Sequence, residues 1–477
     1  MKIKREKLSF KLRYGYGLGQ MSDSIPYNMY ATYFLFFLTN VIGIPAAVGG
    51  TISMIALLWD AVTDPVVGYM SDHSNSKYGR RRPYMIVSLF PLSLFMILMF
   101  LNVDFGNTGN IIYFILIAML FRLVYTGYVI PYFSLGAEIT QDYDERVTIQ
   151  CIAGYAIYIA SWIITAGPMA IIDFAMDHGV SYESSWSIAA TVFSLFSLIC
   201  GLVSWRTLRG SEMTDRRKDI QQKERASIKD IFSVFKTYFV LLKDKICIYM
   251  MILRLTYIFA SSIAGAAFVY LMSVNLGLSE SQQAIYWTIS SAIYIIDIAI
   301  CNFLSNKADK KLIMGITAAI SIVVGIFFYI YGINSFAQLI VSVSLSSFGM
   351  AAFWTIGATM LYDYNEVVEF KTGKRQEGSV SGLILFSQKI GSAIAVWVSG
   401  IVLSAVGYDG TAEVYSEAVK NGILMLNTLV PALITILSLI FVIIYPINRK
   451  NFNLLRKALA LKNEGKEYTT EGFERLL

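Results

Sequence analysis

Long apolar runs separated by short polar segments are the feature of this sequence that most restricts its fold. A membrane-spanning helix needs about 20 predominantly apolar residues. Runs of that length recur near 14–38, 46–69, 84–102, 111–135, 148–172, 185–205, 246–274, 284–304, 312–332, 337–362, 380–406 and 421–446. They are long and continuous rather than short and alternating, which argues against a β-barrel. Only 15% of the residues are charged, against roughly 25% in soluble domains. The sequence therefore predicts an all-α membrane protein with twelve transmembrane helices.

One polar stretch, 207–245, is the only long hydrophilic interruption, and it divides the predicted spans six and six. We therefore expect an N-terminal six-helix bundle over 1–206, a cytoplasmic linker, a C-terminal six-helix bundle over 246–446 and a cytoplasmic tail over 447–477. Apolar residues recur at helical spacing within 228–242. Part of the linker is therefore either a helix in the membrane interface or an extension of the seventh span.

The distribution of Lys and Arg predicts the orientation of the chain. Arg122, Arg254 and Lys389 lie inside predicted spans, and only Lys420 falls in a loop after an odd-numbered span. All the others lie near the termini, in the linker or after even-numbered spans. The positive-inside rule then places both termini in the cytoplasm, in a multi-pass protein of a bacterial plasma (inner) membrane. We expect these basic residues to act at the lipid bilayer and not to bind nucleic acid.

The use of histidine and cysteine argues against enzyme or metal chemistry. His73 and His178 are the only histidines, both in predicted loops, and the four cysteines show no metal-type or redox spacing. The nucleophile–base or HExxH arrangement of an intramembrane hydrolase is not found either. We expect no enzyme activity, no cofactor and no metal beyond a transported ion.

Two aspartates in the second predicted span, Asp60 and Asp64, are the most informative polar residues. Their i, i+4 spacing places both carboxylates on one face of a helix, one turn apart. Two such anions repel each other inside a membrane, so a proton, a cation or a structural partner such as Arg122 must neutralise them. Thr126 in the fourth span offers a neutral oxygen of the kind that Na⁺ accepts. We favour a binding site for a coupling ion, Na⁺ or H⁺.

Other polar and aromatic residues in the spans are candidates for contact with a solute. Asp23 can accept hydrogen bonds from hydroxyl groups, and Lys389 can donate to a solute or neutralise the acidic residues. Tyr30, Phe133 and Trp354 can stack on the apolar face of a sugar ring. The alternatives are helix–helix pairing for Asp23, a structural counter-ion for Lys389 and core packing for the aromatic residues.

Charged residues in two predicted cytoplasmic loops can form a gate. They are basic after the second span and acidic after the fourth: Arg80, Arg81, Arg82, Asp142, Asp144 and Glu145. Ion pairs between the two loops would lock the inward side, and the alternative is that the arginines serve topology alone. Asp297 and Arg254, in the eighth and seventh spans, serve either structural pairing or the transport pathway.

Several motifs follow one another along nearly the whole chain. They are WDAVTDP (59–65), GYMSD (68–72), GRRRP (79–83), IPYFSLGAEITQDYDERV (130–147), YDYNEVVEFKTGKRQEG (362–378) and SQKIGSA (387–393). With them the sequence resembles the glycoside–pentoside–hexuronide:cation symporters of the major facilitator superfamily. The resemblance implies two six-helix bundles that carry out symport of a sugar or glycoside with Na⁺ or H⁺ by alternating access.

The resemblance also implies roles for individual residues. Cation coordination is implied for Asp60, Asp64 and Thr126, and Thr63 stands where an amide is found in the family. Sugar binding, or its coupling to the cation, is implied for Asp23, Tyr30, Trp354 and Lys389, and Phe133 stands where a tryptophan is found. Two positions depart from the pattern: Val129 replaces an expected aspartate and Gly154 an expected arginine. Arg122, on a similar face to Val129, can partly substitute. The alternative is the same fold carrying a non-sugar solute, lipid-like or another small organic molecule. We expect a monomer.

Overall fold

The computed structural model describes most of the chain as helices. The residues that it describes are 8–72, 74, 79, 81–136, 139–140, 143–210, 238–373, 377–412 and 414–477. Two compact units make up this structure, and we describe each by itself. The first takes in the described residues of Met1–Ile231, Gly277–Thr288 and Gly400–Tyr415, and the second those of Phe232–Leu276, Ile289–Ser399 and Ser416–Leu477.

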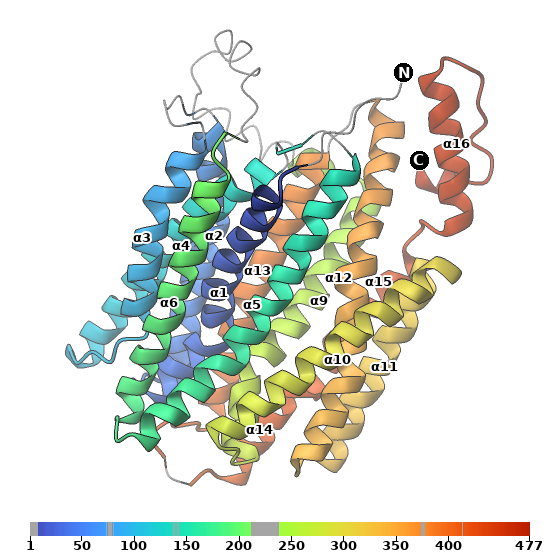
Figure 1. The fold of residues 1–477 in the computed structure, drawn as a ribbon. Coiled ribbons are helices and arrows are strands. Elements are labelled where there is room, and N and C mark those ends of the chain that lie inside the picture. Colours follow the sequence, from blue (N-terminus) through green and yellow to red (C-terminus); the bar gives the residue numbers. More distant parts are fainter. Residues whose placement is uncertain are drawn as a thin grey trace. The chain divides into compact units, whose positions relative to one another are not determined.

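Long helices form the first unit. They are α1 (Phe10–Asn40), α2 (Ala46–Asp72), α3 (Arg82–Met99), α4 (Gly106–Gly136), α5 (Tyr143–Asp177) and α6 (Tyr182–Thr207). Helix α1 packs against α5 and α6, whereas α4 packs against α2 and α3 (Figure 1). The pairing of α2 with α4 matters most for function, because it brings the second and fourth predicted spans into contact.

The helices of the second unit follow the linker. They are α9 (Lys245–Tyr270) with the π-turn η2 (Leu271–Asn275), α10 (Glu280–Lys307), α11 (Lys310–Tyr331), α12 (Phe336–Thr372), α13 (Glu377–Ala405), α14 (Glu417–Asn427), α15 (Leu429–Ile444), α16 (Arg449–Asn463) and the 3₁₀ turn η3 (Glu474–Leu476). The first turns of α10 and the last turns of α13 belong to the first unit. Helix α15 packs against α9 and α11, and α11 also packs against α12.

Local sequence signals account for several helix ends. The Ser181 side chain accepts a hydrogen bond from the amide of Ser184 at the start of α6, and Asp309 does the same for Lys311 at the start of α11. Such N-caps satisfy backbone donors that have no partner inside the helix. The last predicted span is interrupted at Thr428, between α14 and α15. Pro431 in the first turn of α15 is compatible with this new start, because its missing N–H falls where helical donors are not needed.

The predicted spans are confirmed as helices. Among the described residues, eleven helical segments are long and apolar enough to cross a membrane. Helix α1 is the twelfth expected span and has 31 residues. It is more polar than the others because it carries Gln20, Asp23 and Asn28, which belong to the chemistry described below. The predicted boundaries of the two bundles and the tail remain predictions, and 211–237 of the predicted linker lies outside the described residues.

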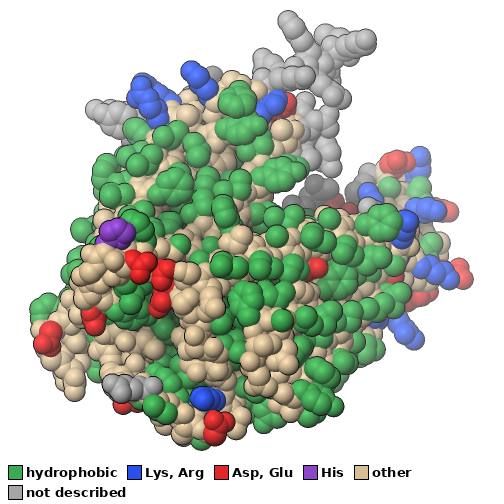
Figure 2. Space-filling model, turned by 60° about the horizontal axis from the view of Figure 1, so that its bottom comes forward, with side chains coloured by type: hydrophobic (Ala, Val, Ile, Leu, Met, Phe, Trp, Pro, Cys, Tyr) green, Lys and Arg blue, Asp and Glu red, His purple; other side chains and the backbone are tan. Residues whose placement is uncertain are grey.

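The exposed side chains of the spans fit a lipid environment. On α3, Val87, Phe90 and Leu94 are exposed and lie on one face, at i, i+3 and i+7. A comparable stripe on α11 includes Ile316 and Val323. Hydrophobic side chains cover much of the face shown in Figure 2, with most Lys and Arg near its edges. An apolar outer surface of this kind is stable in hydrocarbon and unfavourable in water.

The C-terminal tail folds back on the second unit. Helix α16 opens with a capping box at Asn448 and packs against α12. Its apolar face buries Leu455 and Leu459, and further along the tail Phe473 packs edge-on against Phe370 of α12. The tail is therefore a helix docked by burial of apolar surface rather than an extension of the last span.

Candidate functional site: an acidic cluster on α2 and α4

The two aspartates of α2 share one hydroxyl group of α4. The Thr126 oxygen lies 2.8 Å from Oδ1 of Asp60 and 3.0 Å from Oδ1 of Asp64. Asp60 and Thr126 are 2% and 1% exposed, and Asp64 is half-buried. A threonine hydroxyl carries a single hydrogen, so it cannot fully satisfy both carboxylates at once. Side-chain oxygens from α2 and α4 therefore converge at this point.

Arg122 lies one turn before Thr126 on α4 and faces Asp60. Its Nη1 atom is 3.7 Å from Oδ2 of Asp60, and its side chain is 1% exposed. Direct charge-assisted hydrogen bonds are shorter, about 2.7–2.9 Å, so Arg122 acts here as a neighbouring charge. Its guanidinium stacks 4.0 Å from the ring centroid of Tyr30. We call Asp60, Asp64, Thr126 and Arg122 the acidic cluster.

Thr63 and Pro65 shape the turn of α2 that carries the two aspartates. The Thr63 hydroxyl donates to the backbone carbonyl of Asp60 at 3.2 Å, so its hydrogen is used within the helix. Its oxygen still has lone pairs for a cation. Pro65 has no N–H to give to the Ala61 carbonyl, four residues earlier. This turn therefore leaves the Ala61 carbonyl without the helical donor that residue 65 would otherwise supply.

Asp23 on α1 is held by two donors. The Tyr125 hydroxyl donates to Oδ1 at 2.6 Å, and the Gln20 amide donates to Oδ2 at 2.5 Å. Tyr125 directly precedes Thr126, so one stretch of α4 contacts both Asp23 and the acidic cluster. Tyr125 and Gln20 are absent from the sequence predictions. The signal that could have found Tyr125 is a buried phenol next to a predicted ion ligand.

The aromatic candidates differ in exposure. Tyr30 is buried and its hydroxyl donates to the Ser53 carbonyl at 3.2 Å, so the structure places it beside Arg122 in the interior of the first unit. Phe133 in the first unit and Trp354 in the second are 46% and 45% exposed. Lys389 on α13 is half-buried. Exposed rings can stack on a solute, whereas Tyr30 can act on one only through its neighbours.

Part of the predicted gate lies outside the described residues. This part comprises Arg80, Asp142 and the side chain of Asp144. Among the remaining members, Glu145 pairs with Arg13 of α1 at 2.6 Å. Arg82 donates to the Trp205 carbonyl at 2.8 Å and lies over the indole ring. Arg81 is buried. Ion pairing between the two loops therefore stays a prediction, and Arg13 is an additional basic residue on this side.

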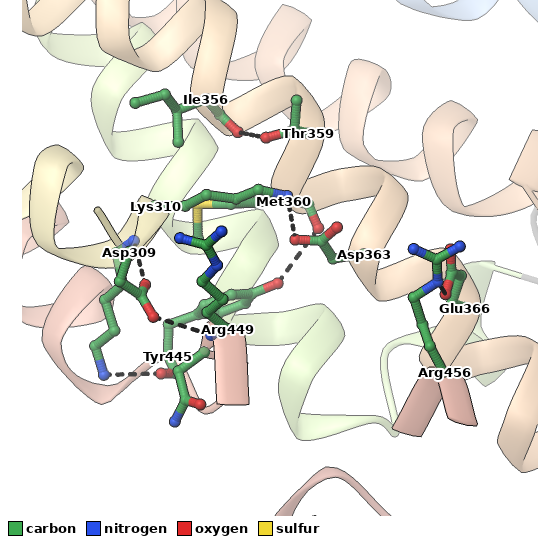
Figure 3. Close-up of polar contacts among 12 residues, drawn as sticks. Asp309, Lys310, Ile356, Thr359, Met360, Asp363, Glu366, Tyr445, Arg449 and Arg456 are labelled. Atoms are coloured by element: carbon green, nitrogen blue, oxygen red, sulfur yellow. Dashed lines mark hydrogen bonds and ion pairs between the residues drawn. The ribbon is translucent and has the colours of Figure 1, made fainter. Parts of the chain in front are cut away.

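A second group of charges lies where α12 ends, within the motif at 362–378. Asp363 accepts from Lys310 of α11 at 2.6 Å, and Glu366 pairs with Arg456 of α16 at 3.4 Å (Figure 3). These contacts connect α12 to α11 and to the C-terminal tail. The motif identifies the acidic residues in the sequence, but their basic partners come from segments that no local pattern singles out.

Several known proteins are similar to this chain along most of its length. A family model described as MFS/sugar transport protein matches residues 15–449. The inner membrane symporter YicJ of Escherichia coli is 25% identical, with 92% of each chain covered. The isoprimeverose transporter of Lactiplantibacillus pentosus is 23% identical over 94% of this chain and 91% of its own. A crystal structure of a bacterial homologue of the human lysosomal transporter Spinster, inward-facing and unoccupied, has a TM-score of 0.68 at 14% identity and covers 91% of this chain and 96% of that one. That likeness shows a shared fold.

Proposed function

Because this chain belongs to the MFS/sugar transport protein family, the glycoside–pentoside–hexuronide:cation symporters, we propose that it carries a sugar or glycoside across a bacterial inner membrane together with Na⁺ or H⁺. It does so as a monomer, by alternating access and with both termini in the cytoplasm.

The observation that carries the proposal is the Thr126 hydroxyl shared by two carboxylates. When ionised, Asp60, Asp64 and Arg122 together sum to one negative charge, which one monovalent cation neutralises. Charged side chains at membrane depth cost about 2.5–3.5 kcal/mol each, so a bound cation lowers the free energy of the cluster. The ion is therefore held tightly while the carboxylates are dry and is released when water reaches them.

Both candidate ions fit the ligand set. Na⁺ can be coordinated by one oxygen from each carboxylate and by the Thr126 hydroxyl, whose hydrogen then turns away. H⁺ can reside on one carboxyl group and be shared with the other through a hydrogen bond, which removes one of the two like charges. Thr63 contributes an oxygen to either arrangement.

Solute binding is assigned to Asp23, which α4 connects to the acidic cluster, and to Phe133, Trp354 and Lys389. Asp23 accepts hydrogen bonds from sugar hydroxyls, and Tyr125 connects it through α4 to Thr126. Phe133 and Trp354 provide exposed rings for stacking, and Lys389 donates to the solute. Binding of the ion fixes α4, and α4 in turn orients the donor to Asp23, which couples the two ligands.

Gradient-driven uptake into proteoliposomes tests this function. Radiolabelled sugars and glycosides are offered under an inward Na⁺ gradient, an inward H⁺ gradient, or neither. We expect one gradient to raise internal solute above the external concentration and its collapse by an ionophore to abolish that accumulation. Glu417→Gln, which changes an exposed carboxylate in the first turn of α14, is the control and should accumulate like the parent. Equal internal and external concentrations under every gradient would contradict symport.

The alternative cargo is a non-sugar solute carried on the same fold, which the apolar side chain at Val129 favours. Competition against a bound fluorescent glycoside separates the two. Displacement by sugars supports the proposal, and displacement only by lipid-like or other organic molecules supports the alternative.

A further inference from the structure

Arg122 of α4 lies among three tyrosine rings of the first unit. Its guanidinium carbon is 4.0 Å from the ring centroid of Tyr30, 5.8 Å from that of Tyr27 and 5.9 Å from that of Tyr125. Tyr27 and Tyr30 belong to α1, and Tyr125 belongs to α4. An aromatic face attracts a cation that lies within about 6 Å of it. These rings therefore stabilise the charge of Arg122 without fixing one position of the guanidinium, because a ring face is a broad partner.

Hydrogen bonds do little to fix Arg122. Among the described residues, its Nε has no hydrogen-bond partner, although the side chain is only 1% exposed. Its Nη1 lies 3.7 Å from Oδ2 of Asp60, whereas a direct charge-assisted hydrogen bond measures about 2.7–2.9 Å. The guanidinium is therefore about 1 Å short of a direct pair. Rotations within a long side chain cover such a distance while α4 stays in place.

Asp60 is shared between this arginine and the proposed ion site. Its Oδ1 lies 2.8 Å from the Thr126 hydroxyl, while its Oδ2 faces Arg122. The carboxylate is 2% exposed, and charges interact more strongly there than in water because the effective dielectric constant is lower. A coupling ion bound to Asp60 and a guanidinium paired with Asp60 therefore repel each other, and each weakens the binding of the other.

From this geometry we propose that Arg122 is a built-in counter-ion. It pairs with Asp60 when the coupling ion has left, and it withdraws onto the Tyr30 ring when the ion binds. A buried carboxylate is costly without a nearby positive charge, so this pair stabilises the empty carrier while the carrier changes conformation. The inference rests on the proposed function and adds the step that returns the empty carrier to its starting side.

Thermal unfolding of the purified full-length protein tests the competition. The concentration at which an ion begins to stabilise the protein reports its affinity. Melting temperatures are therefore measured across Na⁺ concentrations at constant ionic strength and, separately, across pH. Arg122→Gln removes the competing charge, and we expect the ion that stabilises the parent to act at about tenfold lower concentration. A purely structural role for Arg122 would leave this concentration unchanged or raise it.

Two variants of Tyr30 test the same competition with the opposite sign. Tyr30→Leu removes the nearest ring and leaves the guanidinium to Asp60, so the ion should act at about threefold higher concentration. Tyr30→Phe keeps the ring and loses only the hydroxyl, and it should shift this concentration much less. The two variants decide the question if Arg122→Gln does not fold.

Solute fluxes in proteoliposomes test the return of the empty carrier. The probe is the labelled sugar or glycoside that the parent accumulates under an ion gradient. Net efflux into solute-free medium requires the empty carrier to return, whereas exchange of labelled for unlabelled solute does not. We expect Arg122→Gln to slow efflux about tenfold while exchange stays within about threefold of the parent. Arg122→Lys should restore part of the efflux because the charge remains, and Glu417→Gln, an exposed position, should match the parent in both.

The outcomes separate this inference from the proposed function. The built-in counter-ion is overturned, and symport stands, if an ion stabilises the parent but acts at the same or a higher concentration on Arg122→Gln. Equal slowing of efflux and exchange in this variant has the same meaning. If neither ion stabilises the parent, the inference is overturned as well, and gradient-driven uptake then decides on symport.

Discussion

The two units each bury an arginine against an aromatic ring, but they surround it differently. In the acidic cluster, Arg122 stacks on Tyr30 and faces Asp60 at 3.7 Å. In the second unit, Arg254 of α9 stacks on Phe353, and among the described residues its printed hydrogen bonds go to the amide oxygen of Gln388. The same residue type therefore lies beside a carboxylate in one unit and beside neutral groups in the other.

What differs between the two surroundings is the local sum of charge. Two carboxylates beside one guanidinium favour the arrival of a positive charge, and a guanidinium beside neutral groups favours the arrival of a negative one. The difference cannot be read from burial alone, because both arginines are almost inaccessible.

The largest effect should come from exchanging the two arginines for glutamine separately. Arg122→Gln removes the positive charge that lies 3.7 Å from the Asp60 carboxylate, and removing one partner of a buried ion pair costs about 3–5 kcal/mol. We expect the melting temperature without the coupling ion to fall strongly and to be largely restored by saturating ion. Arg254→Gln should change this ion dependence little. The melting temperature of each variant is measured across Na⁺ concentrations at constant ionic strength and across pH. The same ion dependence in the two variants would contradict a different role for the two arginines.

A smaller effect is expected at the shared hydroxyl. Thr126→Val keeps the shape of the side chain and removes the oxygen, so the ion should bind about tenfold more weakly, the equivalent of about 1.4 kcal/mol. Thr126→Ser restores an oxygen and should restore most of the affinity. The measurement is the ion concentration that gives half-maximal uptake. Equal values for Thr126→Val and the parent would remove Thr126 from the ion site.

The smallest effect should come from the link between ion and solute. Tyr125→Phe removes the 2.6 Å hydrogen bond to Asp23 and leaves that of Gln20. We expect solute affinity to fall about threefold to tenfold and ion affinity without solute to stay unchanged. Titration of each ligand separately checks this, and a change in ion affinity alone would place Tyr125 in the acidic cluster instead.

The fold was largely predictable from the sequence. Apolar runs of membrane length fix the helices because every backbone group in hydrocarbon must be bonded within its own segment. The position of Asp60 and Asp64 on one face of α2 follows from helical spacing alone. The docking of helix α16 could not be predicted, because its stability depends on an apolar surface of α12 that the local sequence does not reveal.

Partners between helices were harder to predict. Arg13 pairs with Glu145, 132 residues away, and Tyr125 with Asp23, 102 residues away. Such contacts depend on the rotation and translation of packed helices, to which hydropathy is insensitive. The neighbours of Arg254 were equally hard to predict, because Gln388 and Phe353 come from other helices.

Uphill accumulation in variants that still exchange solute is the most direct test of the acidic cluster as the coupling site. Asp60→Asn and Asp64→Asn are reconstituted, and exchange of labelled for unlabelled solute across the membrane is measured beside accumulation under an ion gradient. We predict that at least one of the two variants exchanges solute but brings it only to equal concentrations on both sides of the membrane. Accumulation by both variants to the level of the parent would show that the ion is coupled elsewhere.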